Sequence, residues 1–530
     1  MCKKEKIFLL FLSLLLTLIV YVTYVIPIYD KIGWNYPFGW DTAAYVATSK
    51  YILTWGSISY LKNISYYPNL YYQLVALISF VTSFHPLTIE TYLPVILFGI
   101  FIYVISFLTF NLTRSLLAST IAMVITSLSP STLILLSHLH RNFTALILNF
   151  FILNSIAKYY ANSDVRKDKL MLAIVGLISV ITSLTWLMSA PFLVAAIIVG
   201  PSFFLFFKII PRAKMTNKLK RTLLALFPML LIYLTYQIIF YDQFIGAINI
   251  ERPPYTILSF IFYSGNNIFL SVLEVLGTIT SFYLVFYKKQ LNFIPILSWT
   301  GACYSNIIFG LTEVKNRVSI LVPHGILIAI FVRVLITRIN YHLKGMILSS
   351  PSNKNKVRDK WILTLKCFIY YFLCTFLVVL VIYSSILGSW ISYENHFKIH
   401  VFRRWATKCD DRPLFEALET LIIREGEAPA DECYYIVIVT KKENIISPFM
   451  LQFYIRSFIP RSFIIYFPEA EYGFLPKISE LYSSELYLDI TWKYIDPDKS
   501  VEDTLLNKKL KYVMLPVLSN VNETIVFNPE

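Results

Sequence analysis

The sequence predicts a mainly helical, multi-pass membrane protein that ends in a smaller α/β domain. Three observations predict this class. Apolar residues make up 57% of the 530 residues, charged residues make up only 15%, and the mean hydropathy is +0.62. A soluble protein carries roughly a quarter charged residues. Apolar runs of about 18 or more residues, long enough to cross a bilayer, recur from Ile7 to Leu387.

The charge divides the chain into two parts. Residues 1–388 hold 31 Lys and Arg against 11 Asp and Glu, a net charge of +20. Residues 389–530 hold 16 and 21, a net charge of −5. The sequence therefore predicts a membrane domain at 1–388 and a separate domain at 389–530. The positive-inside rule accounts for the basic excess, so we expect no nucleic-acid partner.

Eleven spans account for the apolar runs and the basic loops together. The first run, 7–26, is longer than that of a signal peptide and lacks a clear small-residue cleavage site, so we expect it to be retained. With the N-terminus in the cytoplasm, 24 of the 31 basic residues lie on or near the cytoplasmic side and the C-terminal domain lies outside. The predicted spans are 7–28, 88–111, 115–134, 143–160, 170–187, 190–209, 222–241, 268–287, 292–310, 318–337 and 361–387.

The predicted outer loop, residues 29–87, is rich in Trp and Tyr, which favour the membrane–water interface. We expect two short helices here that lie along the outer leaflet. The stretch from Leu70 to Phe84 is apolar enough to be another span, which would invert every later loop. We interpret it as an interfacial or partly embedded helix.

The C-terminal part alternates helix-like and strand-like segments, which favours a small α/β domain. Helices are predicted at 413–424 and 448–457, and strands at 434–440, 463–466 and 512–515. The sequence leaves open whether Cys409 and Cys433 form a disulfide in this outer domain.

Few acids are available for chemistry on the outer face. Asp41 precedes Thr42-Ala43-Ala44-Tyr45, which places it well to cap a helix N-terminus. A cap fixes the direction of the carboxylate, so capping and catalysis are compatible. Glu274 falls inside the eighth predicted span, where an acid is costly unless it faces a cavity or a partner. The predicted outer acids are Asp30, Asp41, Asp242, Glu251 and Glu313.

Three of the seven basic residues predicted on the outer side are candidates for phosphate binding. Arg141 stands between two predicted spans, where it can either extend towards lipid headgroups or bind a phosphate. Lys315 and Arg317 lie in a charged segment that is either a solvated turn or a functional loop. His138 and His140 form no zinc-binding pattern. The sequence also lacks a phosphate-binding P-loop, a His-Glu-x-x-His motif and a Gly-x-Ser-x-Gly motif, which argues against an ATPase, a zinc protease and a serine hydrolase.

An aromatic outer loop, with an acid that opens a juxtamembrane helix, resembles the C-type (GT-C) membrane glycosyltransferases. This superfamily includes protein O-mannosyltransferases and aminoarabinose transferases. The resemblance rests on Gly39–Tyr45, on Tyr67-Pro68-Asn69-Leu70-Tyr71-Tyr72, on Ser129-Pro130 followed by Arg141, and on Arg317–Pro323. It covers the layout of residues 7–387. The Trp-Trp-Asp motif of oligosaccharyltransferase catalytic subunits is missing.

The resemblance implies transfer of a sugar from a polyprenyl-phosphate donor on the outer face of the cell membrane, with inversion. Asp41 would be the general base, and Arg141, Lys315 and Arg317 would bind the donor phosphate. The acceptor would be a glycan, a lipid or a protein, and membrane lipids would surround the site. Thr42 takes the place of a second family acid, so we expect no cofactor and favour a reaction without a divalent metal. The further candidate substrate-binding residues are His138, His140, Glu251, Glu313 and Tyr45.

Two other functions stay open at this stage. A catalytically inactive relative would act as a membrane assembly or binding protein through its outer domain. A transporter of lipid or polysaccharide would instead have a cavity at the midplane, lined by Glu274 and broken helices.

Overall fold

The computed structural model divides the chain into two compact units, which are described here one at a time. The first comprises Met1–Ile26, Pro68–Leu70 and Pro94–Tyr393, and the second comprises Pro27–Tyr67, Tyr71–Leu93 and Glu394–Glu530. The structure describes residues 3–32, 42, 45–50, 52–53, 56, 69–161, 165–187, 189–206, 212–239, 257–309, 318, 320–348, 356–392, 434–440, 462–468, 512–516 and 524–527.

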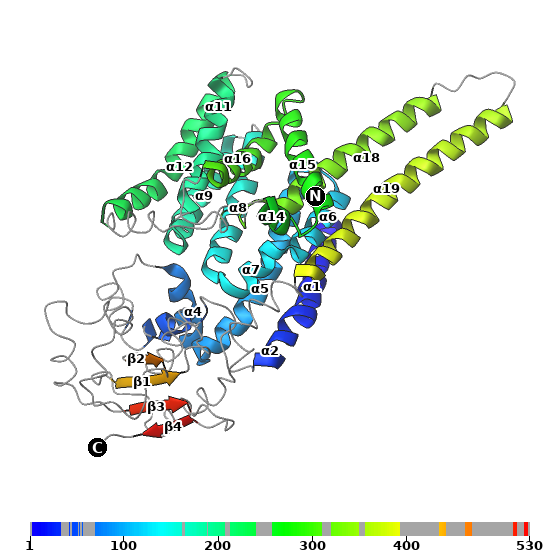
Figure 1. The fold of residues 1–530 in the computed structure, drawn as a ribbon. Coiled ribbons are helices and arrows are strands. Elements are labelled where there is room, and N and C mark those ends of the chain that lie inside the picture. Colours follow the sequence, from blue (N-terminus) through cyan, green and yellow to red (C-terminus); the bar gives the residue numbers. More distant parts are fainter. Residues whose placement is uncertain are drawn as a thin grey trace. The chain divides into compact units, whose positions relative to one another are not determined.

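Helices make up almost all of the described part of the first unit (Figure 1). The N-terminal helix α1 (Lys3–Val20) continues through the π-helical turn η1 (Tyr21–Val25) into α2 (Ile26–Ile32). Residues 27–32 of α2 and residues 86–93 of α5 are assigned to the second unit. The next helices are α5 (Pro86–Thr113), α6 (Leu116–Leu128), α7 (Pro130–His138), α8 (His140–Ala161), α9 (Val165–Thr185), α10 (Ser189–Val194), η2 (Ala195–Val199), α11 (Gly200–Phe206) and α12 (Arg212–Ile239). They are followed by α14 (Ile257–Tyr263), α15 (Ile268–Phe286), η3 (Leu291–Phe293), α16 (Ile294–Phe309), α18 (His324–Leu348) and α19 (Lys356–Ser392).

The apolar helices confirm a multi-pass membrane bundle. Within the described ranges, eight helices are long and apolar enough to cross a bilayer, and each coincides with a predicted span. The predicted span 170–187 coincides with a shorter apolar helix, Lys169–Thr185 of α9, and the predicted span 292–310 coincides with η3 and α16. The number of spans and the orientation of the termini stay predictions.

The predicted span 115–134 is broken rather than straight. Helix α6 ends at Leu128, α7 begins at Pro130, and the two helices are bent by 56°. Pro130 has no backbone N–H to continue the α6 ladder, and it is well suited to the first turn of a new helix. The Ser129 hydroxyl accepts the Thr132 backbone N–H at 3.3 Å, which caps α7. The serine–proline pair therefore ends one helix and starts the next.

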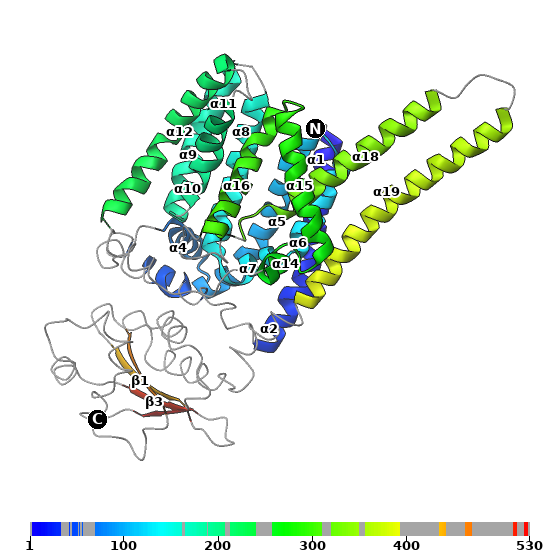
Figure 2. The same cartoon turned by 45° about the horizontal axis from the view of Figure 1, so that its top comes forward.

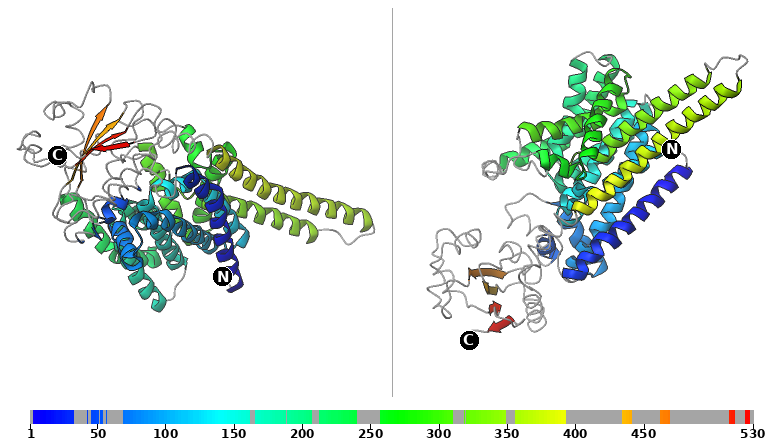
Figure 3. Two further views of the ribbon diagram at one scale, coloured as in Figure 1. Left: turned by 90° about the horizontal axis from the view of Figure 1, so that it is seen from below. Right: turned by 45° about the vertical axis from the view of Figure 1, so that its right-hand side comes forward.

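Glycines allow α18 to pack closely against two neighbours, α15 and α6. A Cβ atom at Gly277 of α15 would overlap the backbone carbonyl of Leu327, and one at Gly325 would overlap the Thr126 hydroxyl. Small residues at such contacts let helix backbones approach closely inside a membrane. Figure 2 shows α15 and α18 side by side, next to their labels. Beyond this contact, α18 and α19 continue as an antiparallel pair (Figure 3).

A lysine provides hydrogen-bond donors for the carbonyl groups at the C-terminal end of α8. The Lys218 ammonium of α12 donates to the carbonyl oxygens of Tyr159 and Tyr160, at 2.6 and 3.2 Å, and lies over the Tyr159 ring. The last carbonyls of a helix lack partners within the helix, and a cation there also complements the helix dipole. Lys218 therefore joins α12 to the C-terminus of α8.

The second unit contains α4 (Leu70–Thr82) and four strands, β1 (Tyr434–Thr440), β2 (Ser462–Pro468), β3 (Tyr512–Pro516) and β4 (Thr524–Phe527). The strand order is β2-β1-β3-β4, with β1 parallel to β2 and β3, and β4 antiparallel to β3. Strands β1, β2 and β3 lie where the sequence predicts strands. The predicted helices at 413–424 and 448–457, and the two cysteines, lie outside the described residues, so the α/β class of this domain stays a prediction.

Helix α4 is the stretch whose membrane placement the sequence leaves open. Its 13 residues rise about 20 Å, less than the ~30 Å hydrocarbon core. The length agrees with an interfacial or partly embedded helix.

We expect Gly277→Ala to destabilise the bundle, because the added methyl group meets the Leu327 carbonyl of α18. Overpacking of this kind costs roughly 1–3 kcal/mol. The matched control is Gly301→Ala, in α16, where no atom lies within 4 Å of the added Cβ. Thermal unfolding in detergent should show a lower apparent Tm for Gly277→Ala than for Gly301→Ala. Equal melting temperatures would contradict the close approach of α15 and α18.

Candidate functional site

The structure leaves part of the candidate site undescribed. Asp41, Glu251, Glu313, Lys315 and Arg317 lie outside the described residues. The side chain of His138, the last residue of α7, is not described either. The convergence of Asp41 with Arg141 and Arg317 therefore stays a prediction.

Arg141 lies at the junction of α7 and α8. Leu139 is the single residue between the two helices, so the connection predicted between the spans 115–134 and 143–160 is reduced to a one-residue break. Buried His140 opens α8, and its ring Nε2 donates to the Leu136 carbonyl at 2.9 Å, which satisfies the end of α7. Arg141 follows in the first turn of α8 and is half-buried. The positive end of a helix dipole and a guanidinium group both favour an anion.

Tyr45 belongs to a buried aromatic cluster in the second unit. Its ring meets Tyr71 edge-on at 5.3 Å between centroids, and Tyr72 at 5.7 Å. The Ser49 hydroxyl donates to the Tyr72 carbonyl at 3.2 Å, and Ile52 packs against Ala76. Residues 45–50 are helical, and this helix is thus held against α4. The cluster fixes the chain a few residues after Asp41.

Tyr71 of α4 also binds an acid. Its hydroxyl donates to the Glu90 Oε2 at 2.9 Å, and both side chains are buried. Burial, reinforced by the Glu90 carboxylate, raises the pKa of Tyr71 well above its ordinary value. The phenol therefore stays protonated and available as a donor. Thr42, beside Asp41, is buried as well.

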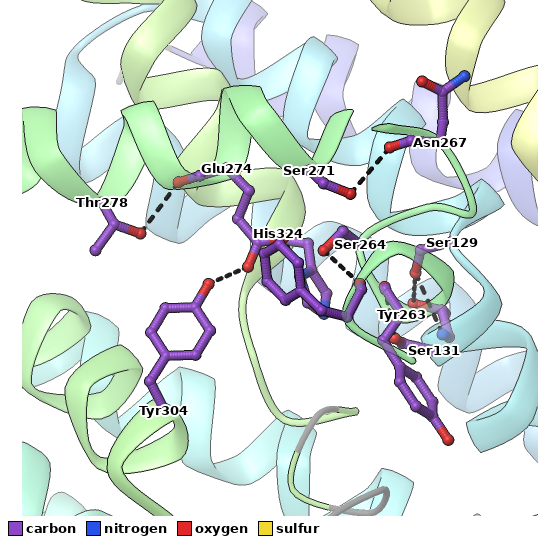
Figure 4. A network of polar contacts seen from close by, with 12 residues as sticks. Ser129, Ser131, Tyr263, Ser264, Asn267, Ser271, Glu274, Thr278, Tyr304 and His324 are labelled. Carbon is purple, nitrogen blue, oxygen red and sulfur yellow. Dashed lines mark hydrogen bonds and ion pairs between the residues drawn. The ribbon is translucent and has the colours of Figure 1, made fainter. Parts of the chain in front are cut away.

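A second polar cluster lies in the first unit, around Glu274 (Figure 4). Glu274 is on α15 and is 0% exposed. His324, the first residue of α18, donates from Nδ1 to the Glu274 Oε2 at 2.7 Å. The Tyr304 hydroxyl of α16 donates to the Oε1 atom. Both carboxylate oxygens of Glu274 are thus bound by residues from two other helices.

Serines and asparagine surround this cluster. Ser131 of α7 donates to the Tyr263 carbonyl at the end of α14, at 3.0 Å. The Asn267 side chain caps α15 by accepting the Phe269 N–H at 2.8 Å. Figure 4 shows these residues beside Glu274 and His324. The region is a meeting point of α7, α14, α15, α16 and α18.

Glu274 has hydrogen-bond partners from two other helices, as the sequence requires of a buried acid. A transporter needs a carboxylate that can exchange protons or bind cargo, whereas both oxygens of Glu274 are engaged within the bundle. Within the described ranges, no group of three or more His, Cys, Asp and Glu side chains is placed to hold a metal ion.

Sequence patterns do not single out Tyr304, His324 or the Tyr71–Glu90 pair. Tyr304 and His324 are 30 and 50 residues from Glu274 in the chain, and neither belongs to a motif. The available signal was the acid itself, which demands a donor from another helix. Tyr71 was noticed only as part of the Tyr-Tyr stretch.

The arrangement of the helices defines the class. The fold is that of the GT-C membrane glycosyltransferases, as the resemblance in the sequence implies. No family model matches the sequence, and no curated protein matches it.

Solved structures of two enzymes are among those that match the chain. The chain is similar to the oligosaccharyltransferase of Archaeoglobus fulgidus, with a TM-score of 0.56 and 13% identity over 97% of this chain and 69% of that chain. The same enzyme, AglB, has been solved with an inhibitory peptide and a dolichol-phosphate, and it then matches with a TM-score of 0.54 at 13% identity, over 97% and 70%. ArnT of Cupriavidus metallidurans, bound to undecaprenyl phosphate, matches with a TM-score of 0.52 and 11% identity over 96% and 97%.

We expect Tyr71→Phe to lower the apparent Tm, because Glu90 then loses the Tyr71 hydroxyl. A hydrogen bond to a charged buried group contributes roughly 1.5–3 kcal/mol. The control is Tyr287→Phe, which removes a hydroxyl from a residue that is 77% exposed. Thermal unfolding of both variants in detergent measures the difference. An unchanged Tm for Tyr71→Phe would show that the Tyr71–Glu90 bond does not stabilise the second unit.

Proposed function

We propose that the chain transfers a sugar from a polyprenyl-phosphate donor to an acceptor on the outer membrane face. Asp41 is the general base, and the anomeric carbon is inverted. The acceptor is a glycan, a lipid or a protein.

The observation that carries this proposal is the GT-C fold over nearly the whole chain. Both neighbours have been solved with a polyprenyl phosphate, either dolichol-phosphate or undecaprenyl phosphate. A lipid phosphate is therefore the ligand chemistry that they share. Arg141, half-buried at the start of α8, is a suitable residue for such a phosphate because a guanidinium group forms paired hydrogen bonds with it.

The proposed reaction needs one base and several cations. The Asp41 carboxylate takes the proton of the acceptor hydroxyl, and the acceptor oxygen forms a bond to the anomeric carbon. The bond from that carbon to the phosphate oxygen breaks, and the electron pair leaves with the polyprenyl phosphate. Arg141, Lys315 and Arg317 stabilise the charge on this leaving group, so that no general acid is needed.

The aromatic cluster supports a positioning role for the helix after Asp41. Tyr45 is 2% exposed and is held between Tyr71 and Tyr72. A base must be held within hydrogen-bond reach of the hydroxyl that it deprotonates. Packing of Tyr45 restricts the movement of the chain that follows Asp41.

We propose the topology that the basic loops favour. The N-terminus is cytoplasmic, eleven spans cross the cell membrane, and residues 389–530 form an outer α/β domain. In this orientation Asp41, Arg141, Lys315 and Arg317 all share the outer face.

The experiment that tests the function compares Asp41→Asn with wild type in membranes supplied with a panel of labelled polyprenyl-phosphate sugars. We expect sugar transfer to fall roughly 10²–10⁴-fold, because the amide cannot take the acceptor proton. Radiolabel incorporated into acceptor material measures the transfer.

Asp30→Asn is the matched control, since Asp30 lies in the same predicted outer loop and has no proposed role. It should transfer sugar at the wild-type rate. Undiminished transfer by a folded Asp41→Asn protein would disprove the mechanism. An inactive wild type across the whole panel would favour the assembly or binding protein instead.

We propose that the reaction proceeds without a divalent metal, because Thr42 replaces the second acid. A buried threonine hydroxyl is a poor substitute for a carboxylate as a ligand of a hard cation. Transfer by wild-type membranes should therefore persist in excess EDTA. Loss of transfer in EDTA, followed by recovery with Mg²⁺ or Mn²⁺, would contradict this proposal.

A further inference from the structure

Two basic segments that follow different predicted spans lie together at one end of the bundle. Arg338 follows the predicted span 318–337, and Lys288 follows the predicted span 268–287. The Arg338 guanidinium of α18 lies over the Tyr283 ring of α15, with 5.3 Å between Cζ and the ring centroid. The backbone N–H of Lys288 donates to the Tyr283 carbonyl at 3.4 Å. Tyr283 is therefore in contact with both segments.

The position of these residues along the helices is that of a membrane surface. The apolar stretches able to span a bilayer end nearby, at Phe286 in α15 and at His342 in α18. Tyr287 stacks on Tyr283 at 5.6 Å between ring centroids and is 77% exposed. Tyrosine and arginine at the end of an apolar helix favour the layer of lipid headgroups. We therefore expect phospholipid headgroups around this end of α15 and α18.

The charge of this surface is positive. Glu274 is the only acid in the described helices α15, η3, α16 and α18, and it is 0% exposed and bound within the bundle. Asp359, near the start of α19, has a basic residue on each side in the sequence. Arg338 and Lys288 are both exposed. The C-terminus of α15 carries the equivalent of about half a negative charge, which two full positive charges outweigh.

The turn that carries Lys288 is fixed by the end of α15. The Gln290 N–H donates to the Leu284 carbonyl at 3.1 Å, and Lys289, the residue before Gln290, has a left-handed φ of +54°. Glycine is the usual residue at this position of a helix end, because an L side chain is strained in this conformation. Strain of this kind concentrates at functional sites. A lysine here places a second cation next to Lys288 in the chain.

Arg338 is preorganised to bind a phosphate. Because its guanidinium is held over Tyr283, less side-chain freedom is lost when it binds a ligand. A planar guanidinium forms paired hydrogen bonds with phosphate oxygens, whereas a lysine ammonium acts as a point charge. The apolar side chains of Ile279 and Phe282, about one turn before Tyr283 and Phe286 on α15, are exposed and suit the acyl chains of a lipid.

We propose that Arg338, Lys288 and Tyr283 form a binding site for the headgroup phosphate of an anionic phospholipid. The site lies on the predicted cytoplasmic face, whereas Asp41 and Arg141 are predicted on the outer face. It needs no sugar transfer, so it goes beyond the proposed function and does not rest on it. A lipid bound here would join the end of α15 to α18 at the membrane surface.

The test uses the full-length protein, purified in detergent and stripped of lipid. Phosphatidylglycerol with a fluorescent acyl chain is titrated in, and phosphatidylcholine with the same acyl chain reports binding to a headgroup without net charge. Wild type should bind phosphatidylglycerol at least about fivefold more tightly, because each basic residue near a membrane surface contributes about that factor to the attraction of anionic lipid. Equal Kd values for the two lipids would overturn the proposal.

Two variants separate a built site from diffuse attraction. Arg338→Gln should raise the Kd for phosphatidylglycerol about fivefold or more. Tyr283→Leu keeps every charge, yet it should raise this Kd about two- to fivefold, because Arg338 loses the ring over which it is held. Lys288→Gln replaces Tyr283→Leu if that variant does not fold, and it should raise the Kd about fivefold.

The matched control is Arg221→Gln, which removes an exposed positive charge from α12 on the same predicted face. It should leave the Kd within about twofold of wild type, because salt screens a charge that is far from the site. Equal weakening by Arg221→Gln and Arg338→Gln would show only the diffuse attraction of the basic loops and would refute the site. Wild-type binding by a folded Arg338→Gln protein would refute it as well.

Inorganic phosphate distinguishes a lipid site from a site for free anions. At matched ionic strength it should not displace phosphatidylglycerol, because it lacks the acyl chains that contact Ile279 and Phe282. Displacement by inorganic phosphate would show that the lipid is not the ligand and would contradict the proposal.

Discussion

The absence of water in the hydrocarbon core is the constraint on which this bundle depends, because each polar group there must find a partner within the protein. Small hydroxyl side chains find this partner in their own helix. Thr109 donates to the Ile105 carbonyl and Thr300 to that of Ile296, both at 2.8 Å. Larger groups need another helix, as in the 2.7 Å bond from Asn111 to Asn154. Polar residues of the second kind decide which helices are neighbours and in which register.

Glu274 is the most demanding case of this constraint. A buried threonine can turn to its own helix, whereas a carboxylate requires donors for two oxygens and obtains them from α16 and α18. The acid thus specifies the relative placement of three helices. By contrast, the glycine contacts of α18 specify only how near its neighbours lie. Between α15 and α18, Gly277 therefore determines the distance and the Glu274–His324 bond determines the orientation.

The sequence predicts the helical bundle well because a helix that crosses the bilayer requires a long run of apolar residues. It also predicts that Glu274 needs a partner, but periodicity carries no information about which distant residue provides it, so His324 was missed. The break at Ser129 was missed for a different reason. Residues 116–134 are long enough and apolar enough to count as one span, and the backbone preference of Pro130 separates them into two helices. The predicted base, Asp41, lies outside the described part of the chain, and the described residues nearest to it on its C-terminal side are Thr42 and Tyr45.

The break between α6 and α7 has a consequence for Arg141. Helix α7 leads to α8 through the single residue Leu139, so the direction of α7 determines where α8 begins. That direction is set at Ser129 and Pro130, by the loss of one backbone donor and the gain of one cap. The location of the arginine is therefore encoded in a helix start that precedes it in the chain. For the proposed phosphate-binding role of Arg141, substitutions at Ser129 and Pro130 would therefore matter as well, through the direction of α7.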